Sequence, residues 1–333
     1  MNREQIDRLM AAISEQQAGC QVQLIETHIS WVIMAGGYAY KIKKPMRYSF
    51  LDFSTLEKRR FYCERELVLN RRLTEDVYLE VVPVRRVDNR CFIDGAQGEI
   101  IDYAVKMKEM ESIRRMDLLL REDKVGYSDI GRLAEKIAGF HGRTEIISDK
   151  DIMDIPLKFA DLANEREFLS GQLSVAAYIE WAVHASLSFM ERHWKLVAAR
   201  QREGLIRDCH GDLHTRNIFL LDDPQPFDCI EFNDDLRQID VLNEIAFLCM
   251  DLDASGRRDL SALFLIRYNE LFPVMRTKEE EKLFLYFESY RANVRAKVNG
   301  YRARIATTRE ERDAALRQTE KYLRLMKEYV EQL

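Results

Sequence analysis

Residues 210–217 decide the interpretation of this sequence, and they read His-Gly-Asp-Leu-His-Thr-Arg-Asn. An apolar run, Ile-Phe-Leu-Leu at 218–221, follows at once and predicts a strand. An aspartate and an asparagine at this spacing, on a loop before a strand, are what phosphoryl transfer requires. The carboxylate of Asp212 can orient and deprotonate an attacking hydroxyl, and the side-chain oxygen of Asn217 can bind a magnesium ion on nucleotide phosphates.

The alternative explanation of this stretch is a polar turn with a hydrogen-bonded histidine. Four fixed residues at these positions arise by accident in about one chain in a thousand of this length. Other parts of the sequence agree with the catalytic interpretation, which we therefore prefer.

Residues 210–217 resemble the catalytic loop of the aminoglycoside phosphotransferase family, a branch of the protein-kinase-like fold. The resemblance runs over roughly residues 20–255 and is closest to a bacterial group known only as aminoglycoside-phosphotransferase-like. Some members of that group are fused to a nucleotide-binding P-loop domain, but this chain contains no Gly-x-x-x-x-Gly-Lys-Ser/Thr motif. The resemblance implies an α+β, two-lobe fold. It also implies an enzyme that uses ATP and Mg²⁺ to phosphorylate a hydroxyl group.

Composition narrows the classes of protein that fit. The chain has 333 residues, of which 47% are apolar and 32% charged, with a net charge of −5. Nucleic-acid binding is not expected without a basic surface, and no apolar run is long enough to cross a bilayer. The polar start, Met1 to Gln17, does not read as a signal peptide. Six scattered cysteines predict buried thiols in the cytoplasm. The oligomeric state cannot be inferred.

The pattern of elements predicts a β-rich nucleotide-binding lobe over 1–108 and a helical lobe with the catalytic loop and acceptor site over 109–333. In the first lobe we expect a helix to residue 17, a helix from a capping box at Ser54–Glu57 to about 73, and strands near 22–25, 29–34, 38–43, 79–87 and 99–107. Gly36-Gly37 predicts a hairpin turn. In the second lobe we expect helices near 112–121, 127–146, 155–170, 174–202, 239–253, 257–272, 278–303 and 308–332, and strands near 205–209, 218–221 and 227–232.

A lysine for the nucleotide phosphates is expected in the strand Tyr-Ala-Tyr-Lys-Ile-Lys at 38–43. The resemblance favours Lys41, and Lys43 remains a competitor because side chains two apart on a strand share a face. The resemblance also implies a helical glutamate that holds this lysine. Glu66 matches it, whereas Glu64 lies about 200° around the helix and points elsewhere.

The second magnesium ligand should follow the catalytic loop, in Phe-Asp-Cys-Ile-Glu-Phe at 227–232. Most of the family has Asp in an Ile-Asp-Phe context, and this chain has Glu231 there. A glutamate is one methylene longer, which shifts the geometry or makes it bidentate. Asp228 is the fallback ligand, although on a strand it would face the opposite side from Glu231.

Supporting residues are also expected around the loop. One carboxylate of the pair Asp240 and Glu244 should hold the catalytic loop from behind, through His210 or through backbone amides. His210 is expected to be a hydrogen-bonding anchor rather than a base. The glycine-free turn that follows the first strand contains Thr27 and His28, and either these side chains, with that of Ser30, cover the phosphates or the turn is ordinary.

The acceptor is a small molecule with a hydroxyl group, but the sequence supports two opposite charges for it. Asp251 and Asp253, with Asp234 and Asp235, would form an acidic rim for a cationic acceptor. Arg291 and Arg295 share a helix face and would suit an anionic one, unless they are ordinary solvated charges.

Three other functions compete with this interpretation. A pseudokinase or scaffold that binds nucleotide without turnover is favoured by Glu231 and the glycine-free turn, and opposed by Asp212 and Asn217. A metallophosphoesterase would need further histidine and asparagine motifs at spacings that are missing. A protein kinase would need a long activation loop ending in Ala-Pro-Glu, which nothing here resembles.

Overall fold

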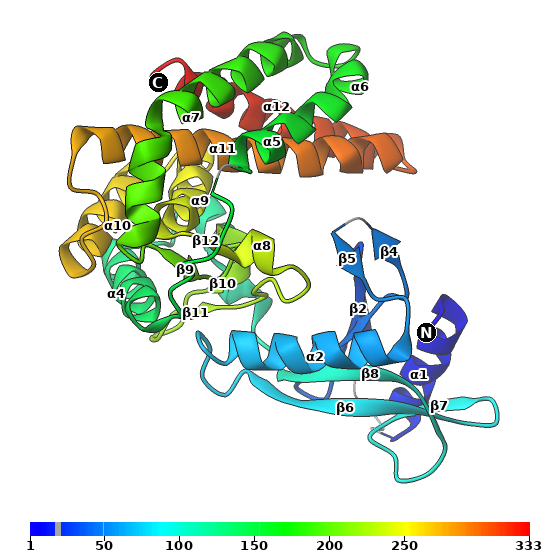
Figure 1. Cartoon of the computed structure of the whole chain (residues 1–333). Helices are drawn as coiled ribbons and strands as arrows, with labels where there is room; N and C mark the ends of the chain where they lie inside the picture. The colour runs from blue at the N-terminus through cyan, green and yellow to red at the C-terminus, as the bar shows by residue number, and fades with distance from the viewer. Residues whose placement is uncertain (17–20, 49, 153) are drawn as a thin grey trace. The chain divides into compact units, whose positions relative to one another are not determined.

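The structure, a computed structural model, describes residues 1–16, 21–48, 50–152 and 154–333. The chain forms two compact units. Unit 1 comprises Met1–Arg115 and Asn217–Leu236, and unit 2 comprises Met116–Arg216 and Arg237–Leu333. Unit 1 is rich in strands and unit 2 is mostly helical, in agreement with the expected α+β class (Figure 1). The division into functional lobes at 108/109 stays a prediction.

Unit 1 is built on a six-stranded antiparallel sheet with the order β1-β2-β3-β8-β6-β7. The strands are β1 Gln23–Glu26, β2 Ser30–Ala35, β3 Tyr38–Lys43, β6 Tyr78–Val87, β7 Arg90–Ile93 and β8 Glu99–Lys108. The predicted hairpin turn is confirmed, since Gly36 and Gly37 have φ of 60° and 78°. Both angles are in the left-handed region that a two-residue turn of this kind needs.

The two faces of this sheet carry different helices. The core on one face contains Ile33 and Ile42 of the sheet together with Ile6 and Leu9 of α1 (Arg3–Gln16). The opposite face packs on α2 (Leu56–Asn70), which lies along β8 and β6 in Figure 1. Because side chains alternate along β3, Lys41 and Lys43 point to the α2 face. The helix cap is Thr55, one residue later than predicted, and it accepts the N–H of Lys58.

The segment 217–236 joins unit 1 through local pairing. Its strands β10 (Ile218–Phe219) and β11 (Gln225–Pro226) pair with each other. The N–H of Cys229 donates to Asn70 Oδ1 at 2.9 Å, and the N–H of Asp228 donates to the Tyr78 hydroxyl at 3.1 Å. These contacts explain why a stretch from the second half of the sequence folds with the sheet.

The strand predicted at 227–232 is wrong. Residues 227–231 have no regular secondary structure, and Asp228 has φ of 64°. The left-handed conformation breaks the two-residue alternation on which the prediction relied. Five short strands of the described residues were also missed, namely β4 (Arg47–Tyr48), β5 (Leu51–Asp52), β7, β11 and β12 (Gln238–Asp240). They are too short and polar to give a clear period-two pattern.

Unit 2 contains most of the predicted helices with small differences at their ends. The helix expected at 155–170 is instead broken into two short helices with a 3₁₀ turn between them, and those expected at 112–121 and 174–202 each begin with a 3₁₀ turn. The helices observed at these positions are α3 Met116–Arg121, α4 Tyr127–Arg143, α5 Ile155–Ala160, α6 Arg166–Ser170, α7 Ile179–Arg202, α9 Val241–Ala254, α10 Arg258–Leu271, α11 Lys278–Ile305 and α12 Arg309–Val330, with short 3₁₀ turns at Ser112–Arg114 (which falls in unit 1), Asp161–Glu165 and Ser174–Tyr178. Strands β9 (Ile206–Asp208) and β12 (Gln238–Asp240) pair with each other. The 3₁₀ turn η4 (Thr215–Asn217) and the short α8 (Asp234–Arg237) lie at the chain crossings between units.

The core of unit 2 forms where α5, α7, α9, α11 and α12 meet. Phe159, Phe247, Tyr290 and Leu323 are buried in one cluster drawn from four of these helices. Within the described residues, no helix has both the length and the apolar sequence that a membrane span requires.

Candidate active site

The loop that carries Asp212 is held from behind by α9. Glu244 is fully buried and accepts the N–H of His210 at 2.6 Å and the N–H of Gly211 at 3.0 Å. Gly211 has φ of 88°, a conformation that glycine adopts without strain. The expectation that a carboxylate of the Asp240/Glu244 pair holds the loop through backbone amides is confirmed for Glu244.

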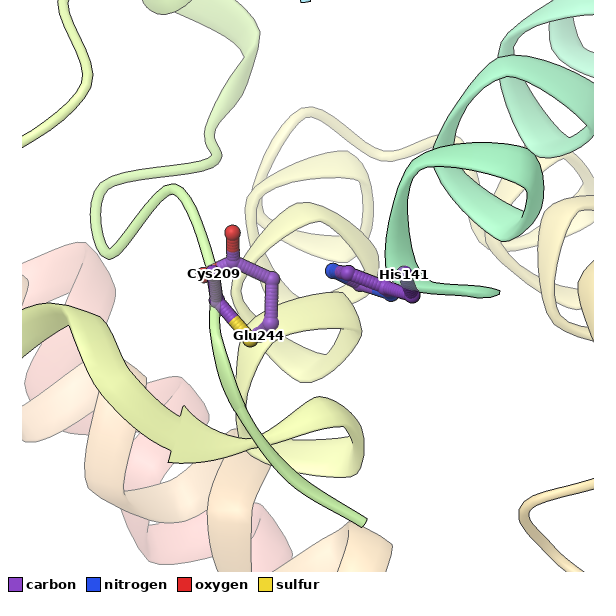
Figure 2. A group of neighbouring side chains, drawn as sticks. All are labelled: His141, Cys209 and Glu244. Carbon is purple, nitrogen blue, oxygen red and sulfur yellow. The ribbon is translucent and has the colours of Figure 1, made fainter. Parts of the chain in front are cut away.

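Glu244 lies beside His141 and Cys209, and Figure 2 shows the three side chains facing one another. Their ligand-capable atoms are all within 4.8 Å of one another. The Nδ1 of His141 lies 2.6 Å from the Tyr268 hydroxyl, and the thiol of Cys209 donates to a backbone carbonyl. Both Glu244 oxygens accept loop amides, so we assign this cluster a structural role and not a metal. Burial raises the pKa of Glu244 to about 7 against the opposing effect of Arg291 and the two amides.

Asp212 is aimed by the two histidines of the loop. Its N–H donates to His210 Nδ1 at 3.2 Å, so His210 acts as an anchor, as predicted. The Nδ1 of His214 accepts the N–H of Arg216, which leaves the Nε2 proton of His214 directed at Asp212 Oδ2, 3.4 Å away. The Asp212 side chain is 37% exposed and can meet a solute.

The charge of Asp212 is stabilised by its surroundings. Burial alone would raise the pKa of its carboxyl, but His214, Arg295 and His210 outweigh burial and lower the pKa below its usual value. Asp212 is therefore ionised throughout the neutral range. The contact of His214 with Asp212 became visible only in three dimensions.

A second group of charged side chains lies on the α2 face of the sheet in unit 1. Lys41 Nζ lies 2.7 Å from Glu66 Oε1 and 2.5 Å from Asp228 Oδ1. Lys43 Nζ lies 2.7 Å from Glu66 Oε2 and contacts Glu231. The buried Glu66 thus bridges both lysines, and although burial opposes it, their charges lower the pKa of Glu66. The predicted partner of Lys41 is in place, and its competitor Lys43 has the same partner.

Exposure distinguishes the two lysines. The side chain of Lys41 is 13% exposed, and that of Lys43 is 1% exposed. Of the two side chains, that of Lys41 is the more exposed, so the geometry agrees with the preference for it. Its role in binding phosphates stays a prediction.

The three oxygen-bearing residues considered for magnesium fall in unit 1. Asn217 and Glu231 are buried, and the Asp228 side chain is 43% exposed. The argument that Asp228 faces away from Glu231 is wrong, because both carboxylates reach the Lys41–Glu66–Lys43 group. Burial raises the pKa of Glu231, so its charge depends on the adjacent lysine. Carboxylate and amide oxygens are the ligands that Mg²⁺ prefers, and the donor set fits the ion.

The turn after β1 and the acidic residue Asp251 were also considered in the sequence, as possible phosphate and acceptor contacts. Thr27 and Ser30 hydrogen-bond to each other across the turn, as in an ordinary ST turn, and His28 stacks on Tyr48. Asp251 is buried and accepts the Thr215 hydroxyl at 2.5 Å, so it is not part of an acidic rim.

The two arginines proposed for an anionic acceptor are not solvated. Arg291 and Arg295 are 5% and 7% exposed. Arg291 donates to the carbonyl of Gly211 and supports the loop, and Arg295 comes within 3.4 Å of His214 Nε2. In the tautomer assigned above that nitrogen carries a proton, so Arg295 and His214 present donors to each other there. The helical period placed both arginines on one face but could not show that the face is buried.

The described cysteines agree with the expectation of buried thiols. Five of the six are free and buried, and they are Cys63, Cys91, Cys209, Cys229 and Cys249. Cys20 lies outside the described residues.

Comparisons with known proteins give relatives without an assigned activity. No protein-family profile matches the chain. Uncharacterized proteins of Mycobacterium tuberculosis and Mycobacterium bovis are 31% identical to it over 284 residues, which are 83% of this chain. The chain spans 54% of the length of these relatives.

Solved structures identify the fold. A choline kinase from Cryptosporidium parvum aligns over 98% of this chain and 94% of its own, with a TM-score of 0.60 and 10% identity. The GDP complex of aminoglycoside 2′-phosphotransferase-IIIa aligns over 97% and 99%, with a TM-score of 0.56 and 13% identity. An ethanolamine kinase of Plasmodium vivax aligns over 92% and 83%, with a TM-score of 0.54 and 10% identity. The chain therefore has the protein-kinase-like two-lobe fold that aminoglycoside phosphotransferases and choline and ethanolamine kinases share.

Proposed function

We propose that this protein is an ATP- and Mg²⁺-dependent phosphotransferase that moves the γ-phosphoryl group to a hydroxyl of a small molecule. The observation that carries the proposal is the orientation of Asp212 by His214, on a loop whose backbone is fixed by Glu244. The fold of small-molecule kinases supports it, and one of those neighbours is a nucleotide complex.

At the γ-phosphorus, the proposed reaction makes one P–O bond and breaks another. The acceptor oxygen attacks the γ-phosphorus, its proton passes to the carboxylate of Asp212, and the bond from the γ-phosphorus to the bridging oxygen breaks. ADP leaves with the electron pair of that bond. Because the transition state is loose, the oxygen needs accurate placement more than a strong base. A carboxylate with a lowered pKa, aimed by His214, suits that requirement.

We assign nucleotide binding to the charged group of unit 1. Lys41, braced by Glu66, would contact the α- and β-phosphates, and Asn217 and Glu231 would hold Mg²⁺, with Lys43 and Asp228 as the alternatives. Bound Mg²⁺ supplies neutralisation of the phosphate charge. Lys41 is paired with Asp228 in this structure, so phosphate binding must compete with that ion pair. The cytoplasm, where ATP and reduced thiols are present, is the proposed location.

One observation favours a second candidate, a pseudokinase that binds nucleotide without turnover. Glu231 replaces the usual Asp and is held by Lys43. A carboxylate engaged in this way is less available to a metal ion. This candidate keeps nucleotide binding and loses transfer, so it makes a different experimental prediction.

The test is ADP release from MgATP with a panel of sugars, amino alcohols, nucleosides, hydroxy acids and aminoglycosides. The proposal predicts acceptor-stimulated ADP release that Asp212→Asn abolishes and that the exposed control Asp222→Asn leaves intact. ATP binding with no stimulation by any acceptor supports the pseudokinase instead. Stimulation that survives in Asp212→Asn contradicts the assigned base.

A further inference from the structure

A polar cavity lies within unit 2, next to the loop that carries Asp212. Its volume is about 180 Å³. Its walls come from α3, from Thr215 and Arg216 of the loop, from Asp251 of α9, and from Lys321 and Tyr322 of α12. These four segments are distant from one another in sequence, so the cavity is a product of the fold. A water molecule occupies about 30 Å³, so a cavity of this size admits a phosphate or carboxylate group with a few further atoms.

Positive charge exceeds negative charge around this cavity. Arg121, Arg216 and Lys321 line it together with only two acids, Asp117 and Asp251. Asp117 is shared by Arg216, at 3.8 Å, and Arg121, at 4.0 Å, and both distances are long for an ion pair. The excess is therefore poorly neutralised by the protein.

Asp251 is committed to neutral partners. It accepts the N–H and the hydroxyl of Thr215 and, at 2.7 Å, the hydroxyl of Tyr322. Its charge also faces Arg295, whose guanidinium lies over the Tyr322 ring at 5.3 Å. Arg295 does not line the cavity but lies close to Asp251. With Arg295 included, four cations lie near the two carboxylates of Asp117 and Asp251.

Lys321 is the least satisfied of these cations. Its ammonium lies 4.9 Å from the centre of the Tyr322 ring, and among the described residues no carboxylate forms an ion pair with it. Burial lowers the pKa of Lys321, and the charges of Arg295, Arg216 and Arg121 add to this effect against that of Asp251. The buried Nε of Arg295 also has no hydrogen-bond partner in the described part of the chain. A partly desolvated ammonium without a carboxylate partner costs folding free energy, so Lys321 suits a ligand of opposite charge, with the more exposed Arg216 and Arg121 beside it.

We propose that this cavity binds the phosphate or carboxylate group of an anionic acceptor, with Lys321, Arg216 and Arg121 as its positive contacts. The inference rests on the proposed phosphotransferase function and names the substrate class. Planar guanidinium groups and an ammonium are the usual donors to such anions. Because Arg216 lies four residues after Asp212, an anion held there would place an attached hydroxyl close to the catalytic loop. A polycationic acceptor of the aminoglycoside kind would be repelled by the same charges.

The first test measures binding of inorganic phosphate by calorimetry, without turnover. Lys321→Met keeps the bulk of the side chain and removes its charge, and we expect phosphate affinity to fall about tenfold or more. Lys327→Met is the matched control, because Lys327 is on the same helix and lies 4.4 Å from a tyrosine ring. Lys41→Met separates this cavity from the proposed nucleotide site and should retain phosphate binding. The proposal is overturned if wild type binds no phosphate, or if only Lys41→Met loses it.

Folding of the variant can be checked independently. Removal of a desolvated, repelled ammonium should leave the unfolding temperature of Lys321→Met equal to or above that of wild type in the absence of phosphate. Phosphate should then raise the unfolding temperature of wild type and of Lys327→Met more than that of Lys321→Met. An equal rise in all three proteins would be general salt stabilisation and would contradict a site.

The second test compares matched acceptors, for example glycerol, glycerate and glycerol phosphate. We expect the charged compounds to be preferred, and Lys321→Met to raise their KM about tenfold with kcat little changed. Transfer to neutral alcohols only, unaffected by Lys321→Met, overturns the anionic class and leaves the phosphotransferase standing. Phosphate binding that depends on Lys321, with no transfer to any acceptor, supports the anion site and refutes the proposed function.

Discussion

At the scale of single residues, the proposed function depends on how Asp212 is oriented. A carboxylate on a flexible loop would sample many directions, and two contacts restrict it here. The backbone of Asp212 is bound to His210, and its side chain faces His214 Nε2. These contacts also explain the lowered pKa of Asp212, since burial works in the opposite direction.

His214→Gln tests this orientation. A base must be ionised, so activity falls as the pH drops through its pKa, and a lowered pKa places that fall below the usual Asp value of about 4. Removal of His214 removes the largest influence that lowers the pKa. We therefore expect the acid limb of the kcat/KM profile to move to higher pH, with lower kcat, whereas the exposed control His184→Gln should match wild type. An acid limb that stays in place would contradict the assignment.

Magnesium dependence provides a second residue-scale prediction. Asn217→Ala should raise the Mg²⁺ concentration needed for half-maximal activity, because one oxygen ligand is lost. An unchanged titration would remove Asn217 from the metal site.

The matched pair Glu231→Gln and Asp228→Asn decides which carboxylate binds the ion. We expect the larger shift in Mg²⁺ requirement for Glu231→Gln. The reverse order would make Asp228 the ligand and Glu231 a partner of Lys43.

The sequence predicted contacts between pairs of residues better than the burial and charge around each residue. The contact of Lys41 with Glu66 was implied by the family resemblance, and it is present at 2.7 Å. The placement of Asp228 was wrong, because the positive φ of this residue cannot be read from the short segment 227–232. The burial of Arg295 and the crowding around Lys321 depend on α12, which the local sequence pattern cannot position.

At the scale of elements, the critical connection runs from α9 to the catalytic loop. The helix begins at its cap Asp240, whose Oδ1 accepts the N–H of Leu242 at 2.8 Å. One turn later, Glu244 accepts the amides of His210 and Gly211. The helix thus fixes the loop from which Asp212 projects.

Glu244→Gln should change how stability depends on pH. Burial raises the pKa of Glu244 from 4.5 to about 7 in the folded protein, so the folded state binds the proton more tightly than the unfolded state. Wild-type stability from this group is full below the unfolded pKa and is lost as the pH rises through about 7, by about 3 kcal/mol at most. The glutamine variant lacks this loss. The free energy of unfolding of the variant, measured in urea, should therefore rise relative to that of wild type between about pH 5 and about pH 8. Parallel pH curves would refute a proton-binding Glu244.

Helices were predicted more accurately than strands at this scale. The helix expected at 308–332 is α12 (Arg309–Val330), because the capping box formed by Thr308 and Glu311 marks its start. The helix expected at 155–170 is instead broken into α5, a 3₁₀ turn and α6. No proline or glycine lies at those breaks, so the sequence pattern did not predict them.

At the scale of the whole molecule, one buried arginine connects three helices of unit 2. Arg200 of α7 binds both oxygens of Asp240 at the start of α9, at 2.7 and 2.8 Å. It also binds Glu280 of α11 at 2.8 Å. The guanidinium is fully buried, so its charge depends on these partners.

Arg200→Ala should destabilise the protein by about 3–5 kcal/mol, because it leaves the buried carboxylate of Asp240 without its ion-pair partner, whereas Glu280 keeps Arg276. The exposed neighbour Arg202 is the control, and Arg202→Ala should cost less than about 0.5 kcal/mol. Chemical denaturation measures both. Equal costs would show that the buried network contributes no more than an exposed charge.

The relatives in mycobacteria are about twice as long as the matched region, so activities of their remaining sequence are open. The class of fold followed from one short motif and the order of strands and helices. The acceptor class that we propose did not follow from the sequence, because the residues around the cavity come from four separate segments. The positive charge of the cavity became apparent only when those segments were assembled.

The central claim is most directly tested by phosphoryl transfer in a single turnover. Wild type and Asp212→Asn are mixed with γ-labelled MgATP and an acceptor from the panel, and nucleotide binding is measured on the same samples. The account predicts equal ATP affinity and a transfer rate that is lower in the variant by orders of magnitude. Equal rates in the two proteins, or the absence of ATP binding by wild type, would contradict it.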